Sequence, residues 1–271
     1  MGEDSGDIDS NALDDVAYLG RSDNRLELLS VLSLEQATRS ELEEETGIAS
    51  TTIGRILNEL QTRGWIERTV DGTYTASPSG QVVIREIEPT IDAMAAVRSL
   101  GEAVAWLPLD ELSISVRHFQ DSIVVRSPPN SPLEFVDYLV EQIRNATTFR
   151  TLTFLDPPTP AGEAMQSGVV DGDLSAEHVL AGGLPEYLRD RQKSPPQWQD
   201  YLEAGANVYR YDDHIPCNLF EFDKKVLIMS DRPEGGGGAI ESTEETVRAE
   251  CRTLFEKYRA SAEPLDADFF A

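Results

Sequence analysis

Residues 50–66, Ser-Thr-Thr-Ile-Gly-Arg-Ile-Leu-Asn-Glu-Leu-Gln-Thr-Arg-Gly-Trp-Ile, decide the fold of the first part of this chain. Apolar residues recur in this stretch at i, i+3, i+4 and i+7, the spacing of one buried helix face: Ile53, Ile56, Leu57 and Leu60. The opposite face carries hydroxyl, amide and guanidinium side chains. We therefore predict an amphipathic helix with an exposed polar face, and we expect Ser50 to be its N-cap.

Helix and turn signals flank this stretch on both sides. Before it, the pattern predicts a helix over about 23–33 and a short helix over 41–46, capped by Thr38 or Ser40 and ended at Gly47. After it, Gly64 suits the left-handed conformation that often ends a helix. Asp71-Gly72 then separates two β-prone segments, which is a strong hairpin signal. This order of elements predicts a winged helix-turn-helix over 21–76, preceded by an acidic N-terminal arm over 1–20.

The polar face of the predicted helix has the chemistry of a DNA-reading surface, because such side chains reach phosphates and base edges in a major groove. Glu59 shares this face, where phosphate would repel it unless it accepts from a cytosine amine. A winged helix that docks protein instead of DNA is the alternative. We expect the contacts to double-stranded DNA to come from Arg39, Ser50, Thr51, Thr52, Arg55, Asn58, Arg63 and Arg68.

The charge of the chain works against DNA binding. The sequence has 49 Asp and Glu against 23 Lys and Arg, a net charge of −26. Residues 21–76 alone carry six arginines against ten acidic residues. The acidic residues are spread along the chain, which resembles the bias of proteins from salt-loving archaea. At molar salt the Debye length is roughly 3 Å, so DNA binding would rest on a few close contacts. The alternative is an acidic protein that does not touch DNA.

Composition also limits location and cofactors. The sequence has no run of about 18 apolar residues, and its acidic start lacks a secretory pattern. We therefore expect a cytoplasmic protein that does not enter a membrane. Cys217 and Cys251 belong to no CxxC motif, so that we expect neither a metal, a cofactor nor a disulfide.

The pattern over residues 77–106 predicts a long helix that links the two domains and forms a dimer contact. Its apolar positions include Val83, Ile84, Ile87, Ile91, Met94, Val97 and Leu100, and Pro89 should kink or break it near Glu88. Packing on its own chain is the alternative, but two-fold half-sites on DNA favour a homodimer.

Residues 107–271 predict a mixed α/β domain that senses a ligand or completes the dimer, so that the whole chain is α+β. We expect a hairpin over 112–118 and 122–126, a helix over 132–145, a strand over 149–155 and mainly helix over 161–204. Strands over 207–211, 218–222 and 225–230, a glycine loop over 235–238 and a helix over 244–260 capped by Thr243 follow.

A turn between two of these strands holds Asp212, Asp213 and His214. Carboxylates beside a histidine can bind a polar ligand, and loops often carry function, so this turn is a candidate effector site; a plain exposed turn is the alternative. His178 is isolated in the sequence and is expected to be a structural or surface residue. Trp198 and Tyr201 could line a pocket, but we expect them to serve packing. Nucleotide-binding and hydrolase motifs are absent, so we expect no enzyme and no catalytic residues.

Several segments resemble archaeal winged-helix transcriptional regulators with a TrmB-like or MarR-like head and a C-terminal part similar to the middle domain of the methanogenesis regulatory protein. The segments that carry the likeness are 40–66, 75–89, 106–112, 208–227 and 255–259. Asp213-His214 and Cys217-Asn218 stand where such proteins often have glycine.

The resemblance implies a sequence-specific transcriptional regulator whose winged head is controlled by a C-terminal sensing or dimerisation domain, with a small-molecule effector. Two other functions stay open. One is an adaptor whose winged helix docks a protein, and the other is an enzyme with a DNA-targeting head in which Asp212, Asp213 and His214 act on a substrate.

Overall fold

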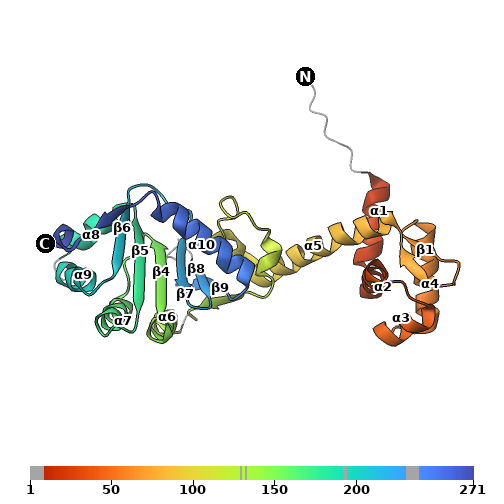
Figure 1. Ribbon diagram of the computed structural model, residues 1–271, viewed down its shortest axis with the longest axis horizontal. Helices are drawn as coiled ribbons and strands as arrows, with labels where there is room; N and C mark the ends of the chain where they lie inside the picture. Colours follow the sequence, from red (N-terminus) through yellow and green to blue (C-terminus); the bar gives the residue numbers. More distant parts are fainter. Residues whose placement is uncertain (1–8, 129, 132, 192–193, 230–237) are drawn as a thin grey trace, which may run out of the picture. The chain divides into compact units, whose positions relative to one another are not determined.

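The computed structural model describes residues 9–128, 130–131, 133–191, 194–229 and 238–271. The chain divides into two compact units, residues 1–91 and 92–271. The division falls inside the long helix α5 (Pro78–Leu100), within the segment that we expected as a linker (Figure 1). Within the described ranges, no helix combines the length and apolar character needed to cross a membrane.

The first unit is a winged helix-turn-helix, as predicted. Its helices are α1 (Ser10–Gly20), α2 (Asp23–Leu34), α3 (Arg39–Thr46) and α4 (Ser50–Thr62). The wing is the antiparallel pair β1 (Ile66–Arg68) and β2 (Tyr74–Ala76). An isolated bridge from Ala37 to Tyr74 adds a third extended segment. Gly47, Gly64 and Gly72 have positive φ angles of 67°, 72° and 88°, which explains glycine at both helix ends and in the hairpin turn.

Helix capping in this unit follows the sequence at one end and departs from it at another. Thr38 and Glu41 form a reciprocal capping box at the start of α3. Ser50, however, does not cap α4. It is the first helical residue, and the N-cap is Ala49, which has no capping side chain and whose carbonyl accepts from Thr52 and Ile53.

The acidic segment before the winged helix is structured from residue 10 onward. Helix α1 buries Tyr18 and Leu19 in the same core as α2 and α4. The ring of Tyr18 lies 6.0 Å from that of Trp65. Apolar burial therefore joins α1 to the winged domain.

Helix α5 runs through Pro89 without ending and stops at Leu100. Gly101 has a φ of 55° and opens the 3-10 turn η1 (Gly101–Trp106). Of the kink or break that we expected near Glu88, the break is therefore wrong. A proline removes one backbone N–H and does not have to end a helix when the remaining hydrogen bonds continue.

The second unit is built on a sheet of order β10-β6-β5-β4-β7-β8-β9-β3. The strands β4, β5 and β6 are parallel, and their other neighbours pair antiparallel. The strand bounds are β3 (Ile123–Arg126), β4 (Thr148–Thr153), β5 (Ser175–Ala181), β6 (Asn207–Tyr211), β7 (Asn218–Phe222), β8 (Val226–Met229), β9 (Gly238–Ser242) and β10 (Glu263–Leu265).

Helices cover both faces of this sheet (Figure 1). On one face, Phe149 of β4 and Phe220 of β7 pack with α6 (Glu134–Asn145), α7 (Thr159–Val170) and α9 (Ser194–Glu203). On the other face, Leu152 of β4 packs with α10 (Glu245–Arg259). The shorter helices are α8 (Leu184–Asp190), η2 (Val116–Phe119) and η4 (Ala267–Phe270). Alternation of side chains along each strand thus divides the interior into two cores.

Several expectations for this unit need correction. Residues 161–204 are mainly helical, as expected, but they also contain β5, the middle strand of the parallel set, which we did not expect. Residues 112–118 form no strand and lead into η2. Gly238 begins β9, while residues 235–237 lie outside the described residues. Glu244 rather than Thr243 caps α10, since its carboxylate accepts from the Val247 N–H.

Candidate nucleic-acid interface

Helix α4 separates its two faces as the sequence predicts. Ile53, Ile56, Leu57 and Leu60 are buried. Thr51, Arg55, Asn58 and Thr62 are exposed, and Thr52 is half-buried. The predicted contact residues of the helix therefore lie on its accessible side, as expected for a recognition helix.

An open hollow of about 590 Å³ lies along the carboxyl half of this face. It brings together three predicted contact residues, Arg55, Asn58 and Arg63. Its remaining lining comes from Asp15, Glu59 and Thr62. The hollow thus mixes the hydrogen-bond donors that recognise phosphates and bases with two carboxylates that phosphate would repel.

Glu59 is the centre of a small polar network in this hollow. Its Oε1 accepts from Arg55 Nη1 at 2.6 Å, and its Oε2 accepts from the Tyr18 hydroxyl at 2.9 Å. Arg25 Nη2 lies 3.6 Å from Oε2. Burial would raise the pKa of Glu59, but the hydrogen bonds from Tyr18 and Arg55 hold it below its usual value. Burial and the bond to Glu59 raise the pKa of Tyr18 to about 12.

Arg63, the C-cap of α4, is tied to α1. Its Nη1 donates to Asp15 Oδ1, and its guanidinium carbon lies 4.1 Å from the centre of the Tyr18 ring. The same guanidinium lies 5.5 Å from the Trp65 ring centre. In the isolated protein, the Asp15 carboxylate of α1 therefore pairs with Arg63, which we expect to contact DNA.

Two further predicted contact residues, Arg39 and Arg68, lie outside α4. Arg39 of α3 is exposed and donates through Nε to the Ser50 carbonyl at 3.0 Å, which links the start of α3 to the start of α4. Arg68 is exposed at the end of β1, with its guanidinium 5.6 Å from the Tyr74 ring. Both keep donors that can reach a phosphate, because a guanidinium carries five N–H groups.

The turn proposed as an effector site is exposed. Asp212, Asp213 and His214 follow β6 at the surface, and Asp212 pairs with Arg210 Nε at 3.0 Å. These residues line none of the pockets described for this protein. Across the described part of the chain, no cluster of three or more His, Cys, Asp or Glu could hold a metal. Cys217 and Cys251 are buried free thiols.

Comparison with known proteins gives a family match for one part of the chain. Residues 13–99 match the family model HVO_A0261 N-terminal domain. The match begins inside α1 and ends inside α5, so it includes the whole winged helix-turn-helix. No curated protein matches the chain.

Two solved structures illustrate more distant likenesses. TrmBL2, described as an archaeal chromatin protein with a novel mode of DNA binding, has 15% identity and a TM-score of 0.40, over 89% of this chain and 92% of that chain. Nuc from Salmonella typhimurium, a phospholipase D family member, has 10% identity and a TM-score of 0.43, over 54% of this chain and 98% of that chain. Both TM-scores lie below 0.5, so neither likeness specifies a function.

Sequence reasoning missed the contribution of α1 and α2 to this surface. Asp15, Tyr18 and Arg25 all touch the polar residues of α4. One signal in the sequence indicated such partners. Glu59 lies on the helix face that we expect to contact phosphate, and an acidic side chain there needs partners from elsewhere in the fold.

Proposed function

We propose that this protein is a sequence-specific DNA-binding transcriptional regulator of the archaeal TrmB-like kind, in which the winged helix-turn-helix binds DNA and the second unit senses a ligand. The observation that carries the proposal is the exposed face of α4. It presents Thr51, Arg55 and Asn58 beside each other while the apolar face of the same helix is buried. These side chains are suited to phosphate and base-edge contacts.

The arrangement of charges favours a few local contacts over general attraction. Helix α3 carries Glu41, Glu43, Glu44 and Glu45, which repel phosphate at low salt. Arg39 and Arg68 flank α4 and are exposed. At molar salt the carboxylates are screened beyond roughly 3 Å, whereas direct guanidinium–phosphate contacts persist because they form at contact distance.

We also propose that the protein acts as a homodimer through α5. Met94 and Val97 are spaced i, i+3 on this helix and are 66% and 46% exposed. Large apolar side chains that stay uncovered on a helix are suited to a second copy of the same helix. A two-fold dimer would present two recognition helices to half-sites one helical turn of DNA apart.

Selection of bound DNA fragments from a random pool, followed by gel-shift titration of the recovered operator in molar KCl, tests DNA recognition. If Arg55 reads a guanine, Arg55→Ala should weaken operator binding by roughly 1–3 kcal/mol. Arg85→Ala is the control, because Arg85 is 71% exposed on α5 and pairs only loosely with Glu86, at 3.8 Å. Equal affinity of the Arg55 and Arg85 variants would rule out the role of Arg55.

The same experiment separates the proposal from its alternatives. An adaptor that docks protein through α4 would recover no enriched sequence and give no footprint at any salt concentration. Light scattering of the full chain tests the dimer, and a Met94→Glu, Val97→Glu double variant should scatter as a monomer. Val170→Glu, which adds charge at another exposed apolar residue, should leave the mass unchanged.

A further inference from the structure

Two adjoining chambers lie in the second unit, on the sheet face covered by α6, α7 and α9. The inner chamber has a volume of about 220 Å³, and the outer one, of about 340 Å³, opens toward the surface. Asp156, Pro157, Met165 and Trp198 line both chambers. The segment from Asp156 to Pro158 begins two residues after the end of β4, so the chambers lie near the carboxyl end of a parallel strand, where α/β proteins commonly bind ligands.

The inner chamber is apolar except for a few groups. Phenylalanines and aliphatic side chains make up most of its wall, including Phe135, Leu139, Phe149 and Phe220. The polar side chains at its surface include Thr151, Thr153 and His178, which point from β4 and β5 toward the α7 side of the sheet. An apolar wall with a few fixed polar groups is the usual composition of a small-molecule site.

A hydrogen-bonded relay links the two chambers. Thr151 Oγ1 lies 2.8 Å from His178 Nδ1, and the Tyr201 hydroxyl lies 2.7 Å from His178 Nε2. Thr151 lines the inner chamber and Tyr201 lines the outer one. Burial lowers the pKa of His178 to about 3, so the imidazole is neutral and carries a single N–H.

The relay contains one more hydrogen-bond donor than its own two hydrogen bonds use. The Thr151 hydroxyl, the ring N–H and the Tyr201 hydroxyl supply three hydrogens, and the relay itself uses two of them. If the ring hydrogen is on Nε2, the Tyr201 hydrogen is left over; if it is on Nδ1, the Thr151 hydrogen is left over. In either tautomer, one end of the relay can donate to a molecule in a chamber, and that molecule must offer an acceptor.

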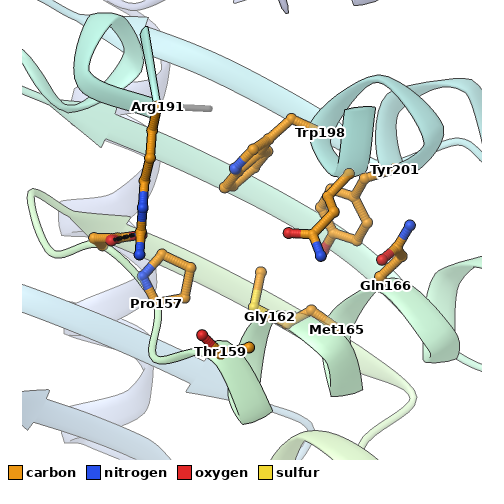
Figure 2. A pocket seen from close by; sticks show the side chains of 10 residues that line it. Pro157, Thr159, Gly162, Met165, Gln166, Arg191, Trp198 and Tyr201 are labelled. Carbon is orange, nitrogen blue, oxygen red and sulfur yellow. Dashed lines mark hydrogen bonds and ion pairs between the residues drawn. The ribbon is translucent and has the colours of Figure 1, made fainter. Parts of the chain in front are cut away.

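The outer chamber adds a cationic group. Figure 2 shows Met165 of α7 and Trp198 of α9 pointing toward each other, with the Arg191 side chain extending along one side of the pocket. Arg191 donates to Asp156, and their side chains are 47% and 29% exposed. Such partly exposed ion pairs contribute little to stability, so a ligand carboxylate can replace Asp156 at small cost. The planar fork of an arginine suits a carboxylate in two-point contact.

We propose that the two chambers form a binding site for a small aromatic carboxylate, with its ring among the apolar side chains and its carboxylate at Arg191. An aromatic ring suits the inner chamber, since an apolar cavity of about 150 Å³ accepts benzene. A carboxylate pairs with the guanidinium and offers only acceptors to the donors of the chambers, whereas an ammonium offers no acceptor and would have to compete with Arg191 for Asp156. The site rests on the second unit alone; only its role as the effector site rests on the proposed function.

The test uses the full chain, without DNA, in molar KCl. We expect 4-fluorobenzoate to show saturable binding in ¹⁹F NMR titrations, and 4-fluorobenzylamine to bind at least tenfold more weakly. Arg191→Gln should weaken 4-fluorobenzoate binding about tenfold, and Thr151→Val, which keeps side-chain shape but removes a hydroxyl, several-fold. Arg189→Gln is the matched control, because Arg189 lies on α8, two residues before Arg191, and lines neither chamber. This variant should change the dissociation constant less than twofold.

A cavity-filling variant completes the test. Ala161 is buried and lines the inner chamber, so Ala161→Leu should abolish binding while the circular dichroism spectrum stays native. The proposal is overturned if wild type binds no 4-fluorobenzoate at millimolar concentration, if the amine binds more tightly, or if Arg191→Gln and Arg189→Gln behave alike. Because DNA is absent, none of these results depends on whether the winged helix binds an operator.

Discussion

The Tyr18 hydroxyl of α1 donates a hydrogen bond to Glu59 Oε2 of α4, at 2.9 Å. This bond joins a helix outside the predicted winged domain to the helix that we propose reads DNA. Arg25 and Arg55 contact the same carboxylate. The orientation of Arg55 is therefore set by a network that includes α1.

Removing the Tyr18 hydroxyl should destabilise the first unit and do so in a pH-dependent way. We expect Tyr18→Phe to lower the free energy of unfolding by about 1 kcal/mol near pH 8, because Glu59 is part-exposed and water replaces some of the lost bond. The pKa of the Tyr18 hydroxyl is raised to about 12 in the folded protein, from near 10. The contribution of the tyrosine is thus complete below pH 10 and is lost as the pH rises through 12.

Denaturant unfolding of wild type and Tyr18→Phe at several pH values from 8 to 12 measures this difference. Tyr187→Phe is the control, because Tyr187 is 55% exposed and the substitution removes the same atom. A constant difference between wild type and Tyr18→Phe across this range would contradict the assigned pKa.

Releasing Arg63 from α1 should strengthen DNA binding. In Asp15→Asn, the partner of Arg63 loses its charge, and the guanidinium becomes available to a phosphate while one source of repulsion disappears. We expect operator affinity to rise several-fold, with the increase largest at low salt. Fluorescence anisotropy with a labelled operator, measured over a range of KCl concentrations, gives the affinities.

Asp14→Asn is the control for this effect. It removes the same charge from an exposed neighbour on α1, and general electrostatics would make the two variants equal. We expect the Asp15 variant to bind more tightly than the Asp14 variant, and we expect the difference to vanish when Arg63→Gln is added to both. An equal gain from both variants would mean that only net charge matters.

Gly80 allows the start of α5 to pack closely on the backbone of Trp65. A Cβ at this position would collide with the backbone carbonyl oxygen of Trp65. That oxygen also accepts from the Ser77 N–H at 2.9 Å, and the Gly80 N–H donates to Ser77 Oγ at 3.1 Å. Since the obstacle is backbone, Gly80→Ala should destabilise the first unit by about 3 kcal/mol, measured by thermal unfolding followed through Trp65 fluorescence.

Gly162→Ala is the matched control. Gly162 lies inside α7, and a Cβ there would meet no atom within 4 Å. The same substitution should stabilise that helix by roughly 0.5–1 kcal/mol. Similar effects at Gly80 and Gly162 would show that helix propensity, and not the contact with Trp65, determines the outcome.

The sequence predicted those elements whose signals are local. Gly47, Gly64 and Gly72 need positive φ angles whatever surrounds them, and the apolar spacing of α4 requires one buried face. The winged helix was therefore predictable from 21–76 alone. The charged residues that pair with α4 were not, because Asp15 and Arg63 are 48 residues apart and their contact depends on the tertiary fold.

Strand β5 shows why the second unit was harder to predict. Its sequence places Glu177 and His178 between apolar residues, so that a regular apolar pattern is interrupted. In the fold, Glu177 pairs with Arg150 at 3.3 Å, and His178 bonds Thr151 and Tyr201. Polar groups satisfied by distant partners can occupy a central strand, and those partners are not visible in the local sequence. His178 and Tyr201 belong to the relay, although the sequence predicted a structural or surface role for the first and packing for the second.

Burial of His178 should make stability depend on pH in the acid range. Burial lowers its pKa to about 3 in the folded protein, against about 6.5 in the unfolded chain. The unfolded state therefore binds the extra proton first. The contribution of neutral His178 is complete above pH 6.5, and falls by up to about 1.4 kcal/mol for each pH unit below this value until the folded pKa is reached.

His178→Gln cannot take up this proton, so its stability deficit relative to wild type should shrink as the pH falls from 7 to 4. Urea unfolding at each pH, with His214→Gln as the control for an exposed histidine, isolates this term from the titration of carboxylates, which all the proteins share. Parallel pH curves for wild type and His178→Gln would show that the histidine has the same pKa in the folded and unfolded states, which would contradict its burial as a neutral group.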